Sequence, residues 1–131
     1  MRITDLFMAT AAAEPDRLFI AAESGERFSY GRTLNIARGF AGYLADNGIK
    51  PLDRVLLSFP NHERLIFAYL GALLRGCTVV LADHSSLPRT IASLLADSGA
   101  RALLCPAGHP AADGSPLFLP FPGALPRARR A

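Results

Sequence analysis

Apolar residues recur along the chain at the two spacings that distinguish helices from strands. Helical spacing predicts a short helix over Ile3–Ala13, which Glu14-Pro15 ends because proline disfavours helix at the residue before it. Two short strands follow, Leu18–Ala22 and Glu26–Ser29, and Ser24-Gly25 between them indicates a hairpin. The first thirty residues are therefore expected to form a helix and a two-stranded ribbon.

The longest predicted helix begins after Ser29, whose hydroxyl can cap its first turn. It ends at Asn47-Gly48, where glycine accepts the left-handed conformation past the last turn. One side of this segment is apolar at helical spacing, through Leu34, Ala37, Phe40, Ala41 and Leu44. That face is expected to pack against the rest of the domain.

Two apolar runs without alternation, Arg54–Phe59 and Thr78–Ala82, are typical of strands that are covered on both faces. Between them, Asn61 can cap a helix that runs to Arg75. This helix is apolar nearly all round, so we expect it to be buried.

A further helix is expected after Ser85 or Ser86, either of which can cap it, and Ser98-Gly99 closes it. Its inward side is formed by Ile91, Leu94 and Leu95. The last strand is Ala102–Cys105. Helices that alternate with buried strands predict an α/β fold with a mostly parallel sheet, three-layered and flanked by helices.

The chain changes character after Cys105. Residues 1–105 are expected to form one subdomain, whereas residues 106–131 are expected to be a disordered tail without regular elements. Proline and glycine punctuate that tail at Pro106, Gly108, Pro110, Gly114, Pro116, Pro120, Pro122, Gly123 and Pro126.

Composition narrows the function classes. Half of the 131 residues are hydrophobic and 19% are charged, which indicates a globular body. The net charge is +3, of which residues 1–105 carry +1 (eleven basic, ten acidic) and the tail carries +2 (three basic, one acidic). A nucleic-acid binder usually shows a basic face interleaved with aromatic residues. We therefore expect no nucleic-acid partner.

We expect a cytoplasmic chain from its cysteines and, from its apolar runs, one that does not cross a membrane. Cys77 and Cys105 adjoin apolar runs and are expected to be buried free thiols, which fits a reducing compartment. The apolar stretch Leu65–Ala82 is about as long as a membrane span, but Arg75-Gly76 interrupts it. A buried helix that runs into a buried strand explains the stretch better.

Five phrases in the right order, from Glu14 to Cys105, carry a family resemblance. They are Pro15-Asp16-Arg17-Leu18; Phe28-Ser29-Tyr30-Gly31-Arg32-Thr33-Leu34; Leu52-Asp53-Arg54-Val55 with Phe59-Pro60-Asn61-His62; Leu73-Leu74-Arg75-Gly76-Cys77 with Thr78-Val79-Val80-Leu81; and Pro88-Arg89 with Asp97-Ser98-Gly99-Ala100. In this order the phrases resemble the start of adenylate-forming enzymes, which are the acyl-CoA synthetases, luciferases and adenylation domains of nonribosomal peptide synthesis. The chain departs from the pattern at Arg32, where a glutamate would complete a capping box with Ser29.

The resemblance implies an ATP-dependent carboxylate-activating ligase. In that family a carboxylate attacks the α-phosphate of ATP, pyrophosphate leaves, and the acyl group passes to a thiol of coenzyme A or a carrier protein. ATP and Mg²⁺ are held by a Ser/Thr/Gly-rich loop, an acidic ribose-binding residue and a late lysine, which the family places downstream of the matching segment. We therefore expect no catalytic, cofactor-binding or metal-binding residue in this chain, no cofactor for the chain alone, and no activity by itself.

Other candidate sites are weaker. Gly71–Thr78 has the spacing of a phosphate-binding loop but closes a helix and opens a strand, the reverse of what phosphate binding needs. Cys105 and His109 could share a metal, but no second pair of ligands follows. Of the isolated histidines His62, His84 and His109, only His84 is expected past the carboxyl end of a parallel strand, where ligands tend to bind.

Three readings of the function stay open. The chain is an inactive remnant of a ligase, or one half of a split ligase that pairs with a complementary chain carrying the nucleotide loops. Otherwise it is a non-catalytic interaction module, for example a homodimer formed through the open edge of the sheet. The first two readings rank above the third.

Overall fold

The computed structural model describes residues 2–60, 63–106 and 118–120. The elements in chain order are α1 (Ile3–Ala13), β1 (Leu18–Ala21), β2 (Arg27–Ser29), α2 (Tyr30–Asp46), β3 (Arg54–Leu57), α3 (Glu63–Arg75), β4 (Thr78–Leu81), α4 (Pro88–Ser98), β5 (Ala102–Cys105) and β6 (Phe118–Pro120). The α/β class expected from the sequence is confirmed.

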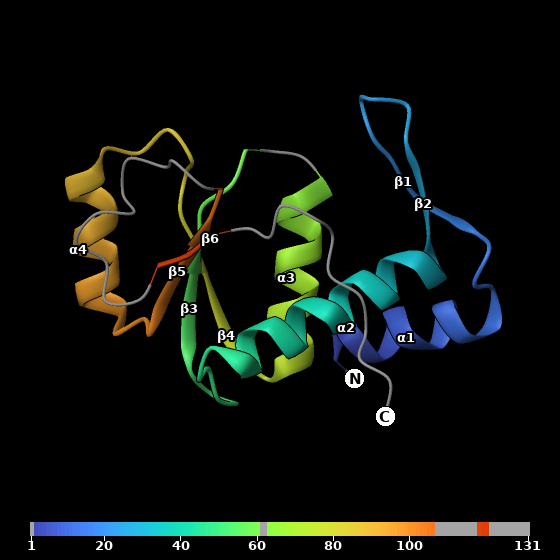
Figure 1. The fold of residues 1–131 in the computed structure, drawn as a ribbon, viewed down its shortest axis with the longest axis horizontal. Coiled ribbons are helices and arrows are strands. Elements are labelled where there is room, and N and C mark those ends of the chain that lie inside the picture. The colour runs from blue at the N-terminus through green and yellow to red at the C-terminus, as the bar shows by residue number, and fades with distance from the viewer. Residues whose placement is uncertain (1, 61–62, 107–117, 121–131) are drawn as a thin grey trace.

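Four strands form one parallel sheet in the order β4-β3-β5-β6, whereas β1 and β2 form a separate antiparallel hairpin. Figure 1 shows α4 on one side of the sheet, α2 and α3 on the other, and the hairpin projecting away from the sheet beyond α2. The molecule is thus layered, with helices on both faces of the sheet as a parallel sheet requires.

Local signals set the ends of α2 as predicted. The backbone N–H of Arg32 donates to the hydroxyl of Ser29 over 3.0 Å, which satisfies one of the free amides of the first turn. At the other end Gly48 takes φ +81°, and the amide of Ile49 bonds back to the carbonyl of Leu44. This left-handed closure turns the chain toward β3.

The main core lies between the sheet and the helix pair α2 and α3. Its buried members are Phe28, Ile36, Phe40, Leu44, Ile49, Val55, Leu57, Phe59, Phe67, Ala68, Ala72, Cys77, Ala102 and Leu104. The two helices approach closely at Gly71, where an added Cβ would lie 2.3 Å from Cβ of Phe40 and 3.0 Å from the carbonyl oxygen of Ala37. Only glycine fits this crossing without a shift of one helix.

The opposite face of the sheet carries a smaller core under α4. Its buried members are Leu56, Ile91, Leu95, Ala100, Leu103 and Cys105. A third cluster, formed by Phe7, Ala37 and Leu70, fixes α1 to the outer side of α2 and α3. Neighbouring residues of β3 and β5 therefore point into different cores, as expected for strands covered on both faces.

The expected cap of α4 is wrong. This helix begins at Pro88, with Leu87 at the N-cap position and no side-chain cap. Proline is well suited to the first helical position, because its fixed φ matches the helix and its missing N–H leaves no amide to satisfy there. Ser85 instead donates its hydroxyl and its backbone N–H to the carboxylate of Asp83 in the preceding turn.

The expectation of no regular element after residue 105 is also wrong. Residues Phe118–Pro120 form β6, which pairs in parallel with β5 and extends the sheet by one strand. Pro120 ends the strand, so its missing N–H costs no further ladder bond. The rest of the segment 106–131, apart from Pro106, lies outside the described residues, as does the predicted cap Asn61.

The predicted burial of α3 holds on one side. Phe67, Ala68, Leu70, Gly71 and Ala72 are buried, whereas Ile66 is 36% exposed on the side that faces the hairpin. Within the described residues no helix is long and apolar enough to cross a membrane.

Candidate functional site

The carboxyl ends of the parallel strands are the first place to look for a site. Asp83 and His84 follow β4 there, as predicted, and both side chains are exposed. The backbone N–H of Ser85 donates to Asp83 over 2.9 Å and the Ser85 hydroxyl over 2.8 Å, which lowers the pKa of the Asp83 carboxyl, with a smaller contribution from His84. These bonds fix the Asp83 carboxylate within the turn before α4 and make it a weaker base.

The two thiols are buried and unsuited to nucleophilic chemistry. Cys77 and Cys105 are free and buried, as the sequence predicted. Burial raises the pKa of Cys105 to about 12. Burial also raises the pKa of Cys77, with a further contribution from the negative charge of Asp53 that Arg75 partly opposes. Both thiols are therefore protonated at neutral pH, whereas the thiolate is the reactive form.

The glycine-rich segment 71–78 does not form a phosphate loop. The amide of Gly76 bonds to the carbonyl of Leu73, and the amide of Cys77 bonds to the carbonyl of Ala72. These amides close α3 and lead into β4, so they are not available to a phosphate. The predicted order of a helix that ends and a strand that follows is confirmed.

No metal site is found where the structure has been described. Residues 2–60, 63–106 and 118–120 contain no group of three or more His, Cys, Asp or Glu side chains that could hold a metal ion. The proposed partner of Cys105, His109, lies outside those residues, as does His62.

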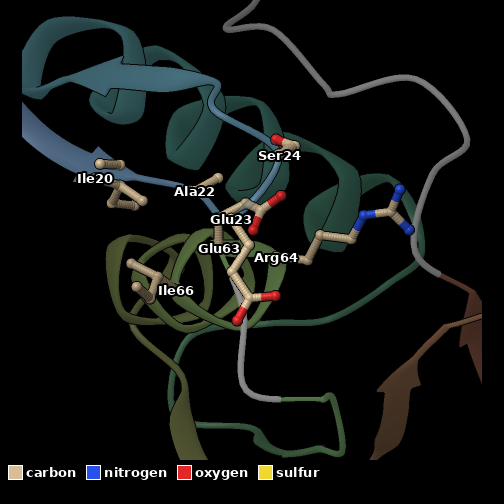
Figure 2. Close-up of a pocket in the computed structure, with 8 residues that line it drawn as sticks. Ile20, Ala22, Glu23, Ser24, Glu63, Arg64 and Ile66 are labelled. Carbon is tan, nitrogen blue, oxygen red and sulfur yellow. The ribbon is translucent and has the colours of Figure 1, made fainter.

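A cavity of about 490 Å³ lies between the hairpin and the first turn of α3 (Figure 2). Ile20 and Ala22 of the hairpin and Ile66 of α3 form its apolar wall. Glu23 and Glu63 add two carboxylates to the lining, and Arg64 adds one guanidinium. The lining therefore carries an excess of one negative charge, which disfavours the phosphates of a nucleotide triphosphate.

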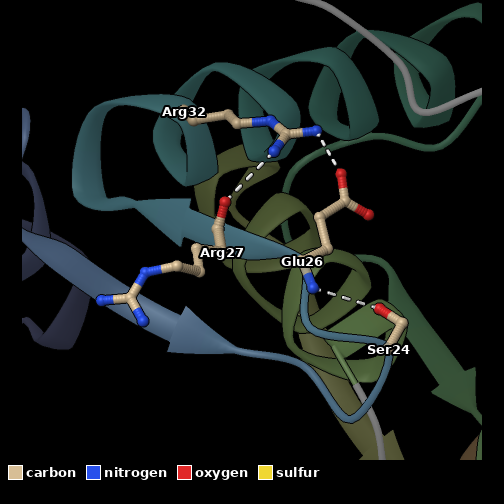
Figure 3. A network of polar contacts seen from close by, with 4 residues as sticks. All are labelled: Ser24, Glu26, Arg27 and Arg32. Carbon is tan, nitrogen blue, oxygen red and sulfur yellow. Dashed lines mark hydrogen bonds and ion pairs between the residues drawn. The ribbon is translucent and has the colours of Figure 1, made fainter.

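Arg32 ties the hairpin to α2, as Figure 3 shows. Its guanidinium donates to the carboxylate of Glu26 over 2.7 Å and to the carbonyl of Arg27 over 3.2 Å. The same group lies over the ring of Phe28, 4.4 Å from the ring centre. In place of the capping-box glutamate, Arg32 thus provides an ion pair and a cation–π contact that join the hairpin to α2.

Sequence reasoning missed this cavity and the contacts of Arg32. The departure at Arg32 was visible, but its partner Glu26 is six residues away, between the two strands of the hairpin. The cavity exists because the hairpin lies next to α3 in the folded chain, and no local sequence pattern predicts that contact. Only the absence of the usual glutamate at position 32 could have pointed to the network.

Comparison with known proteins identifies the fold and the family. A family model described as AMP-binding enzyme matches residues 7–121. Surfactin synthase subunit 1 of Bacillus subtilis (strain 168) is 36% identical over 103 residues, which cover 78% of this chain and 3% of that protein. A medium/long-chain-fatty-acid–CoA/3-oxocholest-4-en-26-oate–CoA ligase of Mycolicibacterium smegmatis is 34% identical over 80 residues, which cover 61% of this chain and 14% of that protein.

Among solved structures, the N-terminal subdomain of Klebsiella oxytoca NpsA, in complex with 3-hydroxybenzoyl-AMSN, superposes with a TM-score of 0.81. The two chains are 22% identical, and the match covers 91% of this chain and 30% of that one. At this identity the likeness concerns the fold alone. The chain spans at most 14% of the length of the two curated relatives above and about a third of the NpsA subdomain.

Proposed function

The chain belongs to the AMP-binding enzyme family, and from that premise we propose that it is the first part of the large domain of a carboxylate-activating ligase. We further propose that residues 1–131 do not activate a carboxylate by themselves. Activity then requires the nucleotide-binding segments, carried either by further sequence of the same polypeptide or by a second chain.

The contacts of the described residues support this division of labour. Carboxylate activation needs amides and a cation around the phosphates of ATP, together with Mg²⁺. The amides of Gly76 and Cys77 are used to close α3, and the cavity beside the hairpin sets the carboxylates of Glu23 and Glu63 against the single guanidinium of Arg64. These groups do not fit ATP and its metal, so no step of the reaction is assigned to them.

One observation carries the proposal. The family match runs from residue 7 to residue 121, which is most of this chain. The superposition on the NpsA subdomain covers 91% of this chain but only 30% of that subdomain. The shared part consists of helices, caps, turns and buried strands, which position other segments rather than react. This asymmetry supports a scaffold role for these residues and a chemical role for the rest of the large fold.

The test is a tagged capture of this chain from its own cells, read by mass spectrometry. We expect peptides of a Ser/Thr/Gly-rich nucleotide loop in stoichiometric amount, from a longer form of the chain or from a second polypeptide. Capture of the short chain without any such segment, together with carboxylate activation by the purified short chain, would overturn the proposal. A parallel capture with an unrelated tagged protein provides the background.

A second candidate is a non-catalytic interaction module, and the edge of the sheet favours it. In the described part of the chain β4 pairs only with β3, and Leu81 on this edge strand is 57% exposed. An exposed apolar edge strand is a template for another chain, a second copy included. Stoichiometric capture of a protein without nucleotide loops would support this function in place of the ligase.

A further inference from the structure

One edge of the hairpin is closed and the other is open. On the closed edge, the carbonyl of Arg27 in β2 accepts a hydrogen bond from the guanidinium of Arg32 in α2 (Figure 3). On the other edge, β1 pairs with no further strand among the described residues, and the cavity between the hairpin and α3 lies along it. An unpaired edge strand offers its backbone groups to another chain.

The register of the hairpin shows which backbone groups face outward from β1. The amide of Ala22 bonds to the carbonyl of Glu26 over 2.9 Å, so the backbone of Ala22 points toward β2. Successive residues of an antiparallel strand point to opposite sides, so the amide and carbonyl of Ala21 point away from β2. The carbonyl of Arg27, which is opposite Ala21, follows the same alternation and points to Arg32. The backbone of Ala21 is therefore available on the side of the cavity, which Ala21 lines.

The cavity has an apolar end and an acidic end, as Figure 2 shows. Ile20 of β1 and Ile66 of α3 form the apolar end, and the carboxylates of Glu23 and Glu63 form the acidic end. Arg64 also lines the cavity, but its side chain points away from both carboxylates. Among the described residues, neither Glu23 nor Glu63 has a hydrogen bond or an ion pair. Both carboxylates can therefore accept a cation from another molecule.

We propose that this cavity binds an extended basic segment of a second protein, in which lysine or arginine stands two positions from an aliphatic residue. The segment adds a strand to the free edge of β1 and bonds to the backbone of Ala21. Side chains two positions apart lie on the same face of a strand, so the aliphatic one contacts Ile20 and Ile66 while the basic one reaches Glu23 and Glu63. In strand addition the backbone bonds supply affinity, and the side-chain contacts supply specificity.

Charge selects this occupant over the alternatives. The lining holds two carboxylates and one guanidinium, and this excess of negative charge attracts a basic segment and repels an acidic one. The basic residues 127–130 of the chain itself are a poorer occupant, because Pro126 stands between Leu125 and Arg127 and has no amide to pair. The contact goes beyond the proposed ligase function and does not depend on it, because it uses no nucleotide-binding segment.

Binding of a short peptide to the full chain tests the proposal. The probe is Thr-Lys-Thr-Val-Thr-Lys-Thr, blocked at both ends, whose valine has a lysine two positions away in either direction. We expect a dissociation constant on the order of 100 μM by NMR titration, because the segment is short. The same peptide with glutamate in place of lysine should not bind. No binding of the lysine peptide at about 1 mM, or equal binding of both peptides, would overturn the proposal.

Two double variants of equal net charge locate the binding site. Glu23→Gln with Glu63→Gln removes both carboxylates of the cavity, and we expect the dissociation constant of the probe to rise about tenfold. Glu14→Gln with Asp97→Asn removes two exposed carboxylates that do not line the cavity, and should leave the affinity unchanged. Equal weakening in the two double variants would mean attraction to the overall charge of the chain and would overturn the site.

The amide of Ala21 reports on strand addition rather than on charge. With about 1 mM probe bound, we expect this amide to exchange its hydrogen about fivefold more slowly. The amide of Ala22, which is already bonded to Glu26, should exchange at an unchanged rate. A probe with N-methylated threonines keeps the charges but loses backbone donors, and should bind about tenfold more weakly. Unchanged exchange of Ala21, or equal binding of the methylated probe, would contradict strand addition.

Two further measurements separate a second protein from other occupants. The full chain with Arg127→Gln, Arg129→Gln and Arg130→Gln should bind the lysine peptide as the wild-type chain does. A tenfold gain in affinity would mean that the chain's own arginines occupy the cavity. Affinity should also be independent of the concentration of the chain, whereas weaker binding at higher concentration would mean that a second copy competes. Either of these contrary results would overturn the choice of a second protein as the occupant.

Discussion

The two faces of the sheet are built differently, although the strands between them are the same. One face is covered by two helices, α2 and α3, which meet at Gly71 and enclose the fully buried aromatic rings of Phe40 and Phe67. Among the described residues, the other face is covered by α4 alone, and the core beneath it contains no aromatic residue. The chain thus places most of its internal packing on one side.

This difference teaches where the fold tolerates change. A closely packed pair of helices cannot relax into a space that a substitution leaves, whereas a single helix can shift toward the sheet. Substitutions that are matched in chemistry but differ in face should therefore differ in cost.

The largest expected effect comes from two neighbouring leucines of β3. Leu57 points into the core under α2 and α3, and Leu56 points into the core under α4, with both side chains fully buried. We expect Leu57→Ala to lower the free energy of unfolding by about 4 kcal/mol and Leu56→Ala by about 2.5 kcal/mol. Urea unfolding of both variants measures this difference. Equal costs, or a larger cost for Leu56→Ala, would contradict the asymmetry.

A pair of glycine-to-alanine substitutions gives the next largest effect. At Gly71 a methyl group would meet Phe40 and the backbone of Ala37, so Gly71→Ala should destabilise by about 2 to 3 kcal/mol despite a gain in helix propensity. At Gly99, after α4, φ is +68° and the nearest atom is 3.9 Å away, so Gly99→Ala should cost about 1 kcal/mol from backbone strain alone. Thermal unfolding ranks the two; a more stable Gly71→Ala chain would mean that the helices are not held in contact there.

The hairpin should respond to Arg32 with a smaller effect. Arg32 and Glu26 are both about half exposed, so Arg32→Met should cost at most about 1 kcal/mol in the free energy of unfolding. In the Arg32→Met chain, we expect the amides of β1 and β2 to exchange faster than in the wild-type chain and the amides of α4 to exchange at the same rate. Arg32→Lys keeps the charge but not the forked geometry, and we expect an intermediate result. Unchanged hydrogen exchange in the hairpin of the Arg32→Met chain would show that the contacts of Arg32 do not stabilise the hairpin.

The effect that is smallest at neutral pH is a pH dependence from the buried Cys105 thiol in the core under α4. The pKa of Cys105 is raised from 9.0 to about 12, so the unfolded chain loses that proton first as pH rises. The contribution of Cys105 is constant below pH 9, and stability is expected to fall as pH increases from 9 toward 12. The free energy of unfolding should therefore fall less between pH 9 and 12 in the Cys105→Ala chain than in the wild-type chain. Urea unfolding at each pH measures this difference. Identical pH profiles for the two chains would contradict the raised pKa.

Much of this fold could be predicted because neighbouring residues in the sequence mark the ends of its helices. Ser29, Gly48 and Gly99 each fix a helix end through their own backbone or hydroxyl, and the structure places all three as expected. The start of α4 could not be predicted from Ser85, because Pro88 supplies a first turn that needs no side-chain cap. The strand β6 has too short an apolar run to signal itself, and it forms because β5 offers an unpaired edge.

The candidate site was harder to predict than the fold. The cavity beside the hairpin joins Ile20 to Ile66, two residues that are distant in sequence and meet only in the folded chain. At the phosphate-loop spacing that begins at Gly71, the order of helix and strand could be predicted, because local patterns mark both elements. Positions that depend on how elements meet are therefore the ones that the sequence left open.

The central claim, that these residues form a scaffold rather than a complete ligase, is tested most directly by ATP–pyrophosphate exchange. The purified 131-residue chain would be assayed with a panel of fatty, aryl and amino acids, beside a no-enzyme blank and a full-length adenylating enzyme. The account predicts exchange at the level of the blank with every acid. Exchange above the blank with any acid would contradict it, because the described residues would then contain chemistry that their contacts do not reveal.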